Sequence, residues 1–298
     1  MKVVRTRLVI SAIAVVLGLG FVGFAGFAIA SAQSPQAKSK FAKLDSSRIH
    51  YLNYGKGDEA LVLIHGWTQN ADAWRDNVAD LSARNRVIVM ELPGHGQSDK
   101  PQLTYSMDYF ARAVEAVMRD AKVKRAVLVG HSMGTPIARQ FYRKYPDQTL
   151  AIVIVDGSLR PFGDQAMIDQ LMGGLRGAKY QDTVSQMMAF MGGANLSAEA
   201  KQRISAASMN TPQPVMVSAF EGMLDNSIWG EDKINVPVLA VMAKSPLTPA
   251  NAEESYRQLA PQLEFVMWSD VGHFLMMEKP KEFNAAVISW LDKNKLLK

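Results

Sequence analysis

Short apolar runs recur along this chain, and amphipathic stretches separate them. Each run is continuously apolar rather than alternating, which is typical of strands buried on both faces in a parallel sheet. The alternation of such strands with helix-like stretches predicts right-handed crossovers and an α/β layered fold. The five runs are residues 61–64, 87–90, 126–129, 152–155 and 238–241, and the amphipathic stretches include 71–82, 106–121 and 250–259.

The two ends of this pattern differ from its centre. Residues 48–54 alternate between apolar and polar side chains and are followed by Gly55 and Gly57, which predicts an antiparallel hairpin at one sheet edge. Residues 263–267 predict a last strand, and residues 280–293 predict a last helix with apolar side chains at helical spacing.

One long stretch, residues 159–230, interrupts the alternation. It has no strong strand signal and contains eight of the 17 methionines of the chain. Its periodicity favours short helices, which predicts a lid or cap inserted between two strands. Methionine fills irregular gaps, so these side chains could form an adaptable apolar pocket wall, or they could be core residues of a small helical insert.

The first 32 residues form a separate segment. Lys2, Arg5 and Arg7 precede an uncharged apolar run over residues 8–30, and Ala-Ser-Ala follows at 30–32. This pattern predicts either a signal peptide cleaved before residue 33 or a retained membrane anchor. Both alternatives place the rest of the chain outside the cytoplasm, as a periplasmic, secreted or membrane-anchored protein, because the positive charges stay inside. Residues 33–40 have the composition of a flexible spacer.

Charge and cysteine content exclude several classes of function. The formal net charge is +5, and three of the positive charges lie in the first 32 residues, which contain no acid. The net positive charge of the rest of the chain is too small for a nucleic-acid-binding surface, so no nucleic-acid partner is expected. The chain has no cysteine, which excludes disulfides, thiolate metal sites and a cysteine nucleophile.

The pentapeptide Gly-His-Ser-Met-Gly at 130–134 lies between a predicted strand and a predicted helix at 135–145. Between a strand and a helix, the G-x-S-x-G pattern indicates a nucleophile turn, although the pattern alone also occurs in plain turns. The glycines at both ends lack a Cβ, so strand and helix could approach closely. The serine oxygen would then stand clear of the sheet, at the positive end of the helix. We therefore predict that Ser132 is a nucleophile.

Two further loops offer partners for this serine. In a doubly wound sheet, ligands bind at the carboxyl ends of the strands. Trp67 follows the first apolar run in the loop His-Gly-Trp, so its backbone N–H can point toward Ser132. Together with the N–H of Met133, it would form an oxyanion hole that stabilises charge developing in the transition state.

Of the five histidines, His273 is the predicted general base. It follows the predicted last strand, and the chain order of nucleophile, acid and histidine selects it. The alternative is a loop histidine that caps a helix. His95, in a glycine-rich loop, is the competitor. The other three lie in the edge hairpin or in turns where packing or a backbone hydrogen bond explains them: His50, His65 and His131.

Four loops of this chain are similar to the signature loops of the α/β-hydrolase fold superfamily. They are His-Gly-Trp at 65–67, Leu-Pro-Gly-His-Gly-Gln-Ser-Asp-Lys-Pro at 92–101, the pentapeptide at 130–134 and Gly-His-Phe at 272–274. The resemblance covers residues 41–158 and 231–298, and it implies a serine hydrolase core in two parts. A helical cap, residues 159–230, would be inserted after the sixth strand of a doubly wound, mostly parallel eight-stranded sheet. The resemblance also implies a Ser-acid-His triad and neither a metal nor an organic cofactor.

The carboxylate of this triad is where the chain departs from the usual pattern. After the fifth apolar run the family commonly carries an Asp, where this chain has Ser245, and a neutral serine could not stabilise an imidazolium. Asp156 ends the fourth run, and haloalkane dehalogenases resemble this arrangement. We predict that Asp156 orients His273. Glu253 or Glu254, a triad without a carboxylate, and an Asp156 that only caps a turn remain as alternatives.

The nucleophile narrows the reaction. A serine at position 132 excludes haloalkane dehalogenases and epoxide hydrolases of this fold, which carry Asp there, and the first loop differs from that of prolyl iminopeptidases. We predict an exported serine hydrolase that cleaves small carboxylic esters with an apolar acyl group, through an acyl-enzyme. One alternative is a cofactor-free haloperoxidase or perhydrolase, whose first loop is similar. The other is a non-catalytic ligand-binding protein, suggested by the missing acid at Ser245. The sequence leaves the substrate's identity and the oligomeric state open.

Overall fold

The computed structural model describes residues 36–161, 163–246 and 248–297. Its centre is an eight-stranded sheet in the order β1-β2-β4-β3-β5-β6-β7-β8. Strand β2 is antiparallel to β1 and β4, and all other neighbours are parallel, which confirms the predicted doubly wound, mostly parallel sheet. The strands are β1 (Lys38–Leu44), β2 (Ser47–Tyr54), β3 (Glu59–Ile64), β4 (Val87–Met90), β5 (Arg125–His131), β6 (Thr149–Val155), β7 (Val238–Ala243) and β8 (Leu263–Trp268).

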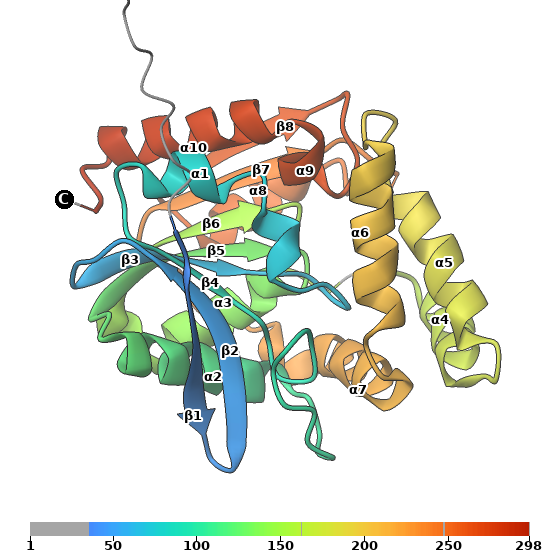
Figure 1. Ribbon diagram of the computed structural model, residues 1–298. Coiled ribbons are helices and arrows are strands. Elements are labelled where there is room, and N and C mark those ends of the chain that lie inside the picture. The colour runs from blue at the N-terminus through green and yellow to red at the C-terminus, as the bar shows by residue number, and fades with distance from the viewer. Residues whose placement is uncertain (1–35, 162, 247, 298) are drawn as a thin grey trace, which may run out of the picture. The chain divides into compact units, whose positions relative to one another are not determined.

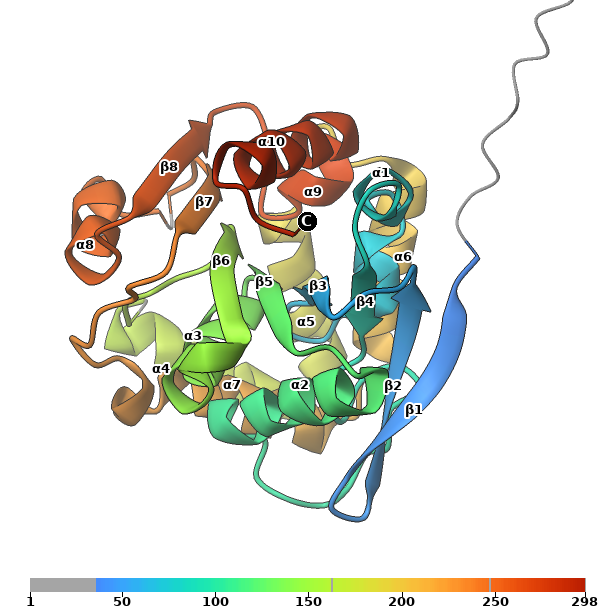
Figure 2. The same ribbon diagram turned by 90° about the vertical axis from the view of Figure 1, so that its left-hand side faces the viewer.

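Helices cover both faces of the sheet (Figures 1 and 2). Helix α2 begins directly after Ser106, whose hydroxyl accepts the backbone N–H of Tyr109 at 3.1 Å and so caps the first turn. One face carries α2 (Met107–Ala121) and α3 (Gly134–Lys144), and the other carries α1 (Val78–Ser82), α9 (Leu275–Glu278) and α10 (Pro280–Lys293), while α8 (Ala252–Leu259) joins β7 to β8.

The five predicted apolar runs are the centre of the sheet. Strands β3 to β7 contain them, and β4 and β7 are buried along their whole length. Helices on both faces leave these side chains no contact with water, which explains why the runs are continuously apolar. Strand β8 lies at the sheet edge and is buried only in part.

The predicted spacer at 33–40 is wrong for its last residues. Strand β1 begins at Lys38, where Lys38 pairs with Asn53 and Lys40 with Tyr51 of β2. The first four residues of β1 are exposed, so no apolar pattern marks them as a strand. An edge strand that carries lysines is a common protection against pairing with other chains. The folded core therefore begins three residues before the predicted boundary at 41.

The amphipathic stretch 71–82 forms two short helical pieces rather than one. The 3₁₀ turn Ala71–Trp74 and helix α1 are separated by Asn77. This side chain is buried, and its amide donates to the Met276 carbonyl and to Asn284, both at 3.0 Å. A buried asparagine that bonds inward competes with a continuous helix at this point.

Between β6 and β7 the chain forms helices beside the sheet (Figure 1). We call α4 to α7 the cap helices. They lie within the predicted insertion 159–230, each is 12 residues long, and α4 and α5 have only two buried residues apiece. The cap helices are α4 (Gln165–Arg176), α5 (Tyr180–Met191), α6 (Ala198–Met209) and α7 (Gln213–Leu224), followed by the 3₁₀ turn Asn226–Ile228.

The predicted signal peptide or anchor at 1–32 lies outside the described residues. Over residues 36–297, gaps excepted, no helix has the length and hydrophobicity needed to cross a bilayer.

Candidate active site

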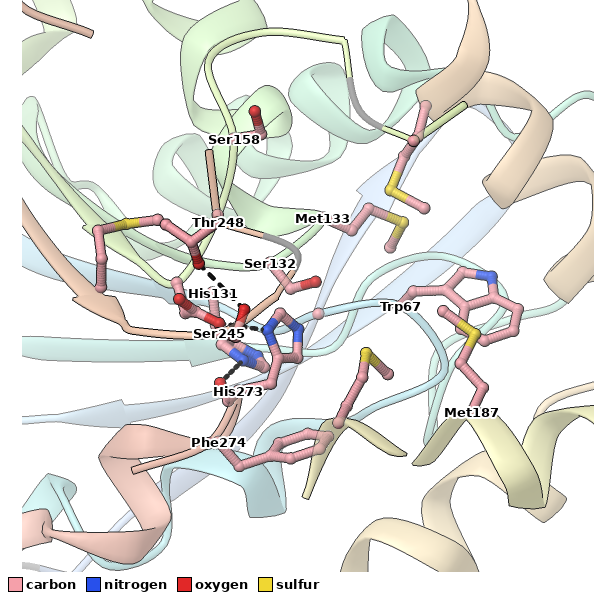
Figure 3. Close-up of a pocket in the computed structure, with 18 of the residues that line it drawn as sticks. Trp67, His131, Ser132, Met133, Ser158, Met187, Ser245, Thr248, His273 and Phe274 are labelled. Atoms are coloured by element: carbon pink, nitrogen blue, oxygen red, sulfur yellow. Dashed lines mark hydrogen bonds and ion pairs between the residues drawn. The ribbon is translucent and has the colours of Figure 1, made fainter. Parts of the chain in front are cut away.

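The turn between β5 and α3 holds Ser132 in a strained conformation. Its φ is 52°, in the left-handed region that side chains other than glycine rarely adopt. A Cβ added at Gly130 would overlap the backbone of Gly134, and one at Gly134 would overlap the carbonyl of Ile64, so both glycines are needed for this close approach. The N–H of Ser132 donates to the Val155 carbonyl at 3.0 Å. The turn presents the serine hydroxyl to a pocket (Figure 3).

His273 and Asp156 form a close pair at the same pocket. Nδ1 of His273 lies 2.6 Å from Oδ2 of Asp156, and the other carboxylate oxygen accepts the N–H of Ala243 at 2.8 Å. Asp156 is itself strained, with a φ of 42°. Because the carboxylate accepts the Nδ1 proton, the imidazole presents Nε2 as its proton-accepting nitrogen. Figure 3 shows this imidazole and the Ser132 hydroxyl turned to the same space.

Ser245, at the position where the family commonly carries an acid, lines the same pocket, and its Oγ is 3.0 Å from Oγ1 of Thr248 in the loop after β7. The two candidate glutamates are not among the residues that line this pocket. Glu253 and Glu254 are exposed on α8, and Glu253 pairs with Arg257 at 2.7 Å. The structure therefore brings Asp156, rather than either glutamate, to the imidazole.

His131, directly before Ser132, holds the loop that carries His273. Its Nε2 lies 2.9 Å from the backbone carbonyl of His273, so this nitrogen bears the proton. Its Nδ1 is buried and has no hydrogen-bond partner among the described residues. Burial above all, and then the neighbouring His273, hold the pKa of His131 well below its ordinary range. A neutral His131 adds no positive charge beside the imidazolium that His273 would form. The sequence predicts packing or a backbone hydrogen bond for His131, but it does not identify the His273 carbonyl as the acceptor.

The competing histidine, His95, is fully buried and does not line the pocket that contains Ser132. Its Nδ1 lies 3.0 Å from the Pro93 carbonyl, and burial lowers its pKa to about 3. His65 is likewise structural: its ring joins the Gly66 carbonyl, at 2.8 Å, to the loop after β4, and burial lowers its pKa to about 4. Both rings are therefore neutral at physiological pH.

The loop after β3 lies against the turn between β5 and α3 that holds Ser132. A Cβ at Gly66 would be 2.9 Å from Nδ1 of His131 and 3.1 Å from the Cβ of Ser132. Among the residues that the structure describes, the backbone N–H groups of Trp67 and Met133 have no acceptor. Both residues line the pocket with Ser132. Two unoccupied N–H donors beside a serine are the arrangement that an oxyanion hole requires.

The pocket has a volume of about 500 Å³. The sheet loops supply its polar groups, and the cap helices supply apolar walls, including Phe190 and Phe220. Methionines are frequent in the lining, and four of the six come from the insertion. Those in contact with the pocket are Met133, Met187, Met188, Met191, Met223 and Met242.

The cap is attached to both sides of the site. The His273 N–H donates to the carbonyl of Met191, the last residue of α5, at 2.9 Å. A Cβ at Gly193 would overlap the backbone of Gly272, so the chain after α5 lies directly on the His273 loop. On the other side, the Trp67 indole donates to the Met216 carbonyl of α7 at 2.9 Å. Neither contact could be read from the sequence, because both use backbone carbonyls of the cap.

A family model described as alpha/beta hydrolase fold matches residues 59–280. The chain is 25% identical to the dihydrolipoyllysine-residue acetyltransferase component of the acetoin cleaving system of Cupriavidus necator, over 86% of this chain and 70% of that protein. It is 26% identical to a 2-(acetamidomethylene)succinate hydrolase of Mesorhizobium japonicum, over 84% and 94% of the two chains. A solved thermophilic esterase is 26% identical, with a TM-score of 0.70 over 87% of this chain and 98% of that one. Within the described residues, no group of three or more acidic or histidine side chains could hold a metal ion.

Proposed function

The chain belongs to the alpha/beta hydrolase fold family, and from that premise we propose that it is a serine hydrolase that cleaves carboxylic esters through Ser132, His273 and Asp156. The observation that carries the proposal is the 2.6 Å contact between Asp156 and His273 at the pocket that Ser132 enters. A strained serine, a histidine whose Nδ1 faces a carboxylate, and that partly buried carboxylate are the parts of an acyl-transfer site. Relatives of the chain include a hydrolase and an esterase.

In the first half of the reaction, Ser132 Oγ attacks the acyl carbon of the ester. Nε2 of His273 takes the hydroxyl proton, and Asp156 stabilises the imidazolium that forms. The backbone N–H groups of Trp67 and Met133 donate to the carbonyl oxygen as it becomes an oxyanion. His273 then gives the proton to the leaving alcohol, and the acyl group remains on Ser132 as an ester.

In the second half, a water molecule takes the place of the alcohol. His273 Nε2 accepts its proton while the oxygen attacks the acyl carbon, and the same two N–H groups hold the second oxyanion. Collapse of this intermediate returns the proton to Ser132 and releases the carboxylic acid. The active site needs only groups that the chain itself supplies for these steps.

The lining favours a small ester with an apolar acyl group. A volume of about 500 Å³ accommodates a small molecule, and the six methionines and three phenylalanines around it are apolar. Flexible methionine side chains adjust to acyl groups of different shape.

The test measures hydrolysis of 4-nitrophenyl esters of increasing acyl length by the wild type and by Ser132→Ala. We expect the rate to depend on acyl length and to fall by several orders of magnitude in Ser132→Ala. Equal rates in the two proteins would overturn the proposal. A parallel assay of peroxide-dependent bromination distinguishes the perhydrolase alternative. The Asp156–His273 contact supports the hydrolase over the binding-protein alternative, and covalent labelling of Ser132 by a fluorophosphonate distinguishes the two.

We also propose that the enzyme acts outside the cytoplasm. The basic residues at 2, 5 and 7 and the apolar run at 8–30 support export, with cleavage or anchoring as the outcome. N-terminal sequencing of the protein from periplasmic and membrane fractions tests this. A mature protein that begins at Gln33 indicates cleavage, an intact N-terminus in the membrane fraction indicates an anchor, and an intact protein in the cytoplasm contradicts export.

A further inference from the structure

A second serine, histidine and carboxylate lie in line at the edge of the sheet. Nε2 of His50 is 2.9 Å from Oγ of Ser39, and Nδ1 of His50 is 2.8 Å from Oε2 of Glu91. Ser39 is on β1, the outermost strand, and His50 is on β2. Three strands separate β1 from β5, which leads to Ser132, so at the usual strand spacing the two serines belong to regions about 19 Å apart across the sheet.

The carboxylate of this group is built into the fold. Glu91 is 5% exposed, and its Oε2 also accepts the N–H of Gln97 at 2.6 Å. Gly96 has a φ of 49°, and a Cβ there would overlap the carboxylate, so the loop wraps closely around it. Burial alone would raise the pKa of Glu91, but hydrogen bonds from His50 and Gln97 outweigh burial and hold it below its ordinary value. Glu91 is therefore an anion at neutral pH.

The anion fixes the tautomer of the neutral histidine. A carboxylate only accepts hydrogen bonds, so Nδ1 of His50 donates to Glu91, and in the neutral ring Nε2 is the acceptor. The Ser39 hydroxyl at 2.9 Å then donates to Nε2. This is the orientation in which a histidine removes a proton from a serine oxygen.

Access differs between the members of the group. Ser39 is exposed, whereas His50 is 1% exposed and lies beside the Phe41 ring, with centroids 5.1 Å apart. An acyl donor can therefore reach the serine oxygen from solvent. Once the serine carries an acyl group, water has little access to His50, so His50 is poorly placed to activate water for hydrolysis of the new ester.

We propose that Ser39 is a second activated serine, which His50 and Glu91 prime for covalent acylation by reactive acyl donors. Ser39 Oγ forms a bond to the acyl carbon, its proton passes to Nε2 of His50, and the leaving group departs with the electron pair of the broken bond. A leaving group that is stable as an anion, such as a nitrophenolate, needs no proton from His50. The ester on Ser39 then persists, which makes this a modification site rather than a second site of turnover. The proposal does not depend on Ser132.

The test uses the full chain with Ser132→Ala, so that the pocket nucleophile is absent. The protein is treated with a fluorophosphonate and, separately, with 4-nitrophenyl acetate, and the adducts are mapped by peptide fragmentation mass spectrometry. Ser46 is the internal control, because it is exposed at the tip of the same hairpin and has no histidine partner among the described residues. We expect Ser39 to be labelled faster than Ser46 by a factor on the order of 10².

Two variants complete the experiment. Adding His50→Gln should reduce labelling at Ser39 to the rate at Ser46, and adding Ser39→Ala should abolish the adduct while leaving the fold intact. Equal labelling of Ser39 and Ser46 in the Ser132→Ala protein overturns the proposal. Because that comparison lies within a single folded protein, it decides the matter even if the His50 variant is unstable.

Discussion

The carboxylate of Asp156 lies 2.6 Å from the imidazole of His273 and also accepts the N–H of Ala243, the last residue of β7. Asp156 follows β6, the strand that pairs with β7, and its carboxylate lies at the end of β7. The hydrogen bond to Ala243 ties it to the end of the strand whose own loop lacks a carboxylate.

Asp156→Asn should lower kcat for ester hydrolysis by a factor on the order of 10³–10⁴, because an amide neither fixes the tautomer of His273 nor stabilises its cation. Steady-state kinetics measures the effect. Ser245→Ala is the matched comparison and should cost less than roughly tenfold, since a neutral hydroxyl carries no such charge. If Ser245→Ala abolished turnover and Asp156→Asn did not, Asp156 would not be the acid.

Gly66→Ala should lower kcat by a factor on the order of 10², since displacing reacting groups by a fraction of an ångström has effects of this size. The added Cβ would lie 3.1 Å from the Cβ of Ser132, and relieving the contact moves the Trp67 N–H. KM should change little. A kcat equal to that of the wild type, in a protein with unchanged circular dichroism, would argue against an oxyanion role for this loop.

His131→Phe tests the positioning of the base. A planar aromatic ring, although a larger one, is kept, but the hydrogen bond from Nε2 to the His273 carbonyl is lost. We expect kcat to fall about ten- to a hundredfold with a smaller change in KM, because the base loop loses its anchor. Thermal unfolding runs alongside as a control. A large loss of stability with normal kcat would mean that His131 acts only in packing.

Buried histidines should make the protein sensitive to acid. His95 has a pKa of about 3 in the folded chain, against 6.5 for an exposed histidine. The unfolded state therefore binds a proton below pH 6.5 that the folded state does not, so the contribution of neutral His95 to stability is full above pH 6.5 and declines as the pH falls toward 3.

Between pH 6.5 and 4.5, this single group should lower the free energy of unfolding by roughly 2–3 kcal/mol. Urea unfolding of the wild type and of His95→Gln at both pH values measures the difference. The variant should show a correspondingly smaller drop. Parallel changes in the two proteins would mean that His95 is not the titrating group.

Gly193→Ala should disturb the contact between the cap and the base loop. Its Cβ would overlap Glu278 and the backbone of Gly272, next to His273. We expect a lower kcat and a lower melting temperature. The control is Gly173→Ala on α4, where the added methyl would have no heavy atom within 4 Å. A glycine replaced by alanine inside a helix should be neutral or slightly stabilising. Identical behaviour of the two variants would count against the contact.

The central strands and the turn at Ser132 could be predicted because a local run of residues identifies each of them. Val87–Met90 is buried on every side, and its sequence shows it. The start of β1 could not be predicted, since exposed lysines at an edge strand look like those of a linker. The break at Asn77 depends on Asn284, 207 residues away, which no local pattern reveals.

The site divides in the same way. Ser132 and His273 stand in local motifs, and Asp156 was favoured by its place after a strand and by the need for an anion. The carbonyl of Met191 has no side-chain signature at all, because any residue there would supply the same acceptor. The Ser39–His50–Glu91 group was missed because its members come from three segments with no common motif.

The hydrogen bond from His273 to the carbonyl of Met191 has a kinetic consequence. A ligand that displaces α5 outward would also displace the loop that carries His273. An ester of unsuitable shape could then bind in the pocket without reacting. The enzyme would then discriminate between esters in the chemical step, so that substrates of similar affinity would differ in kcat.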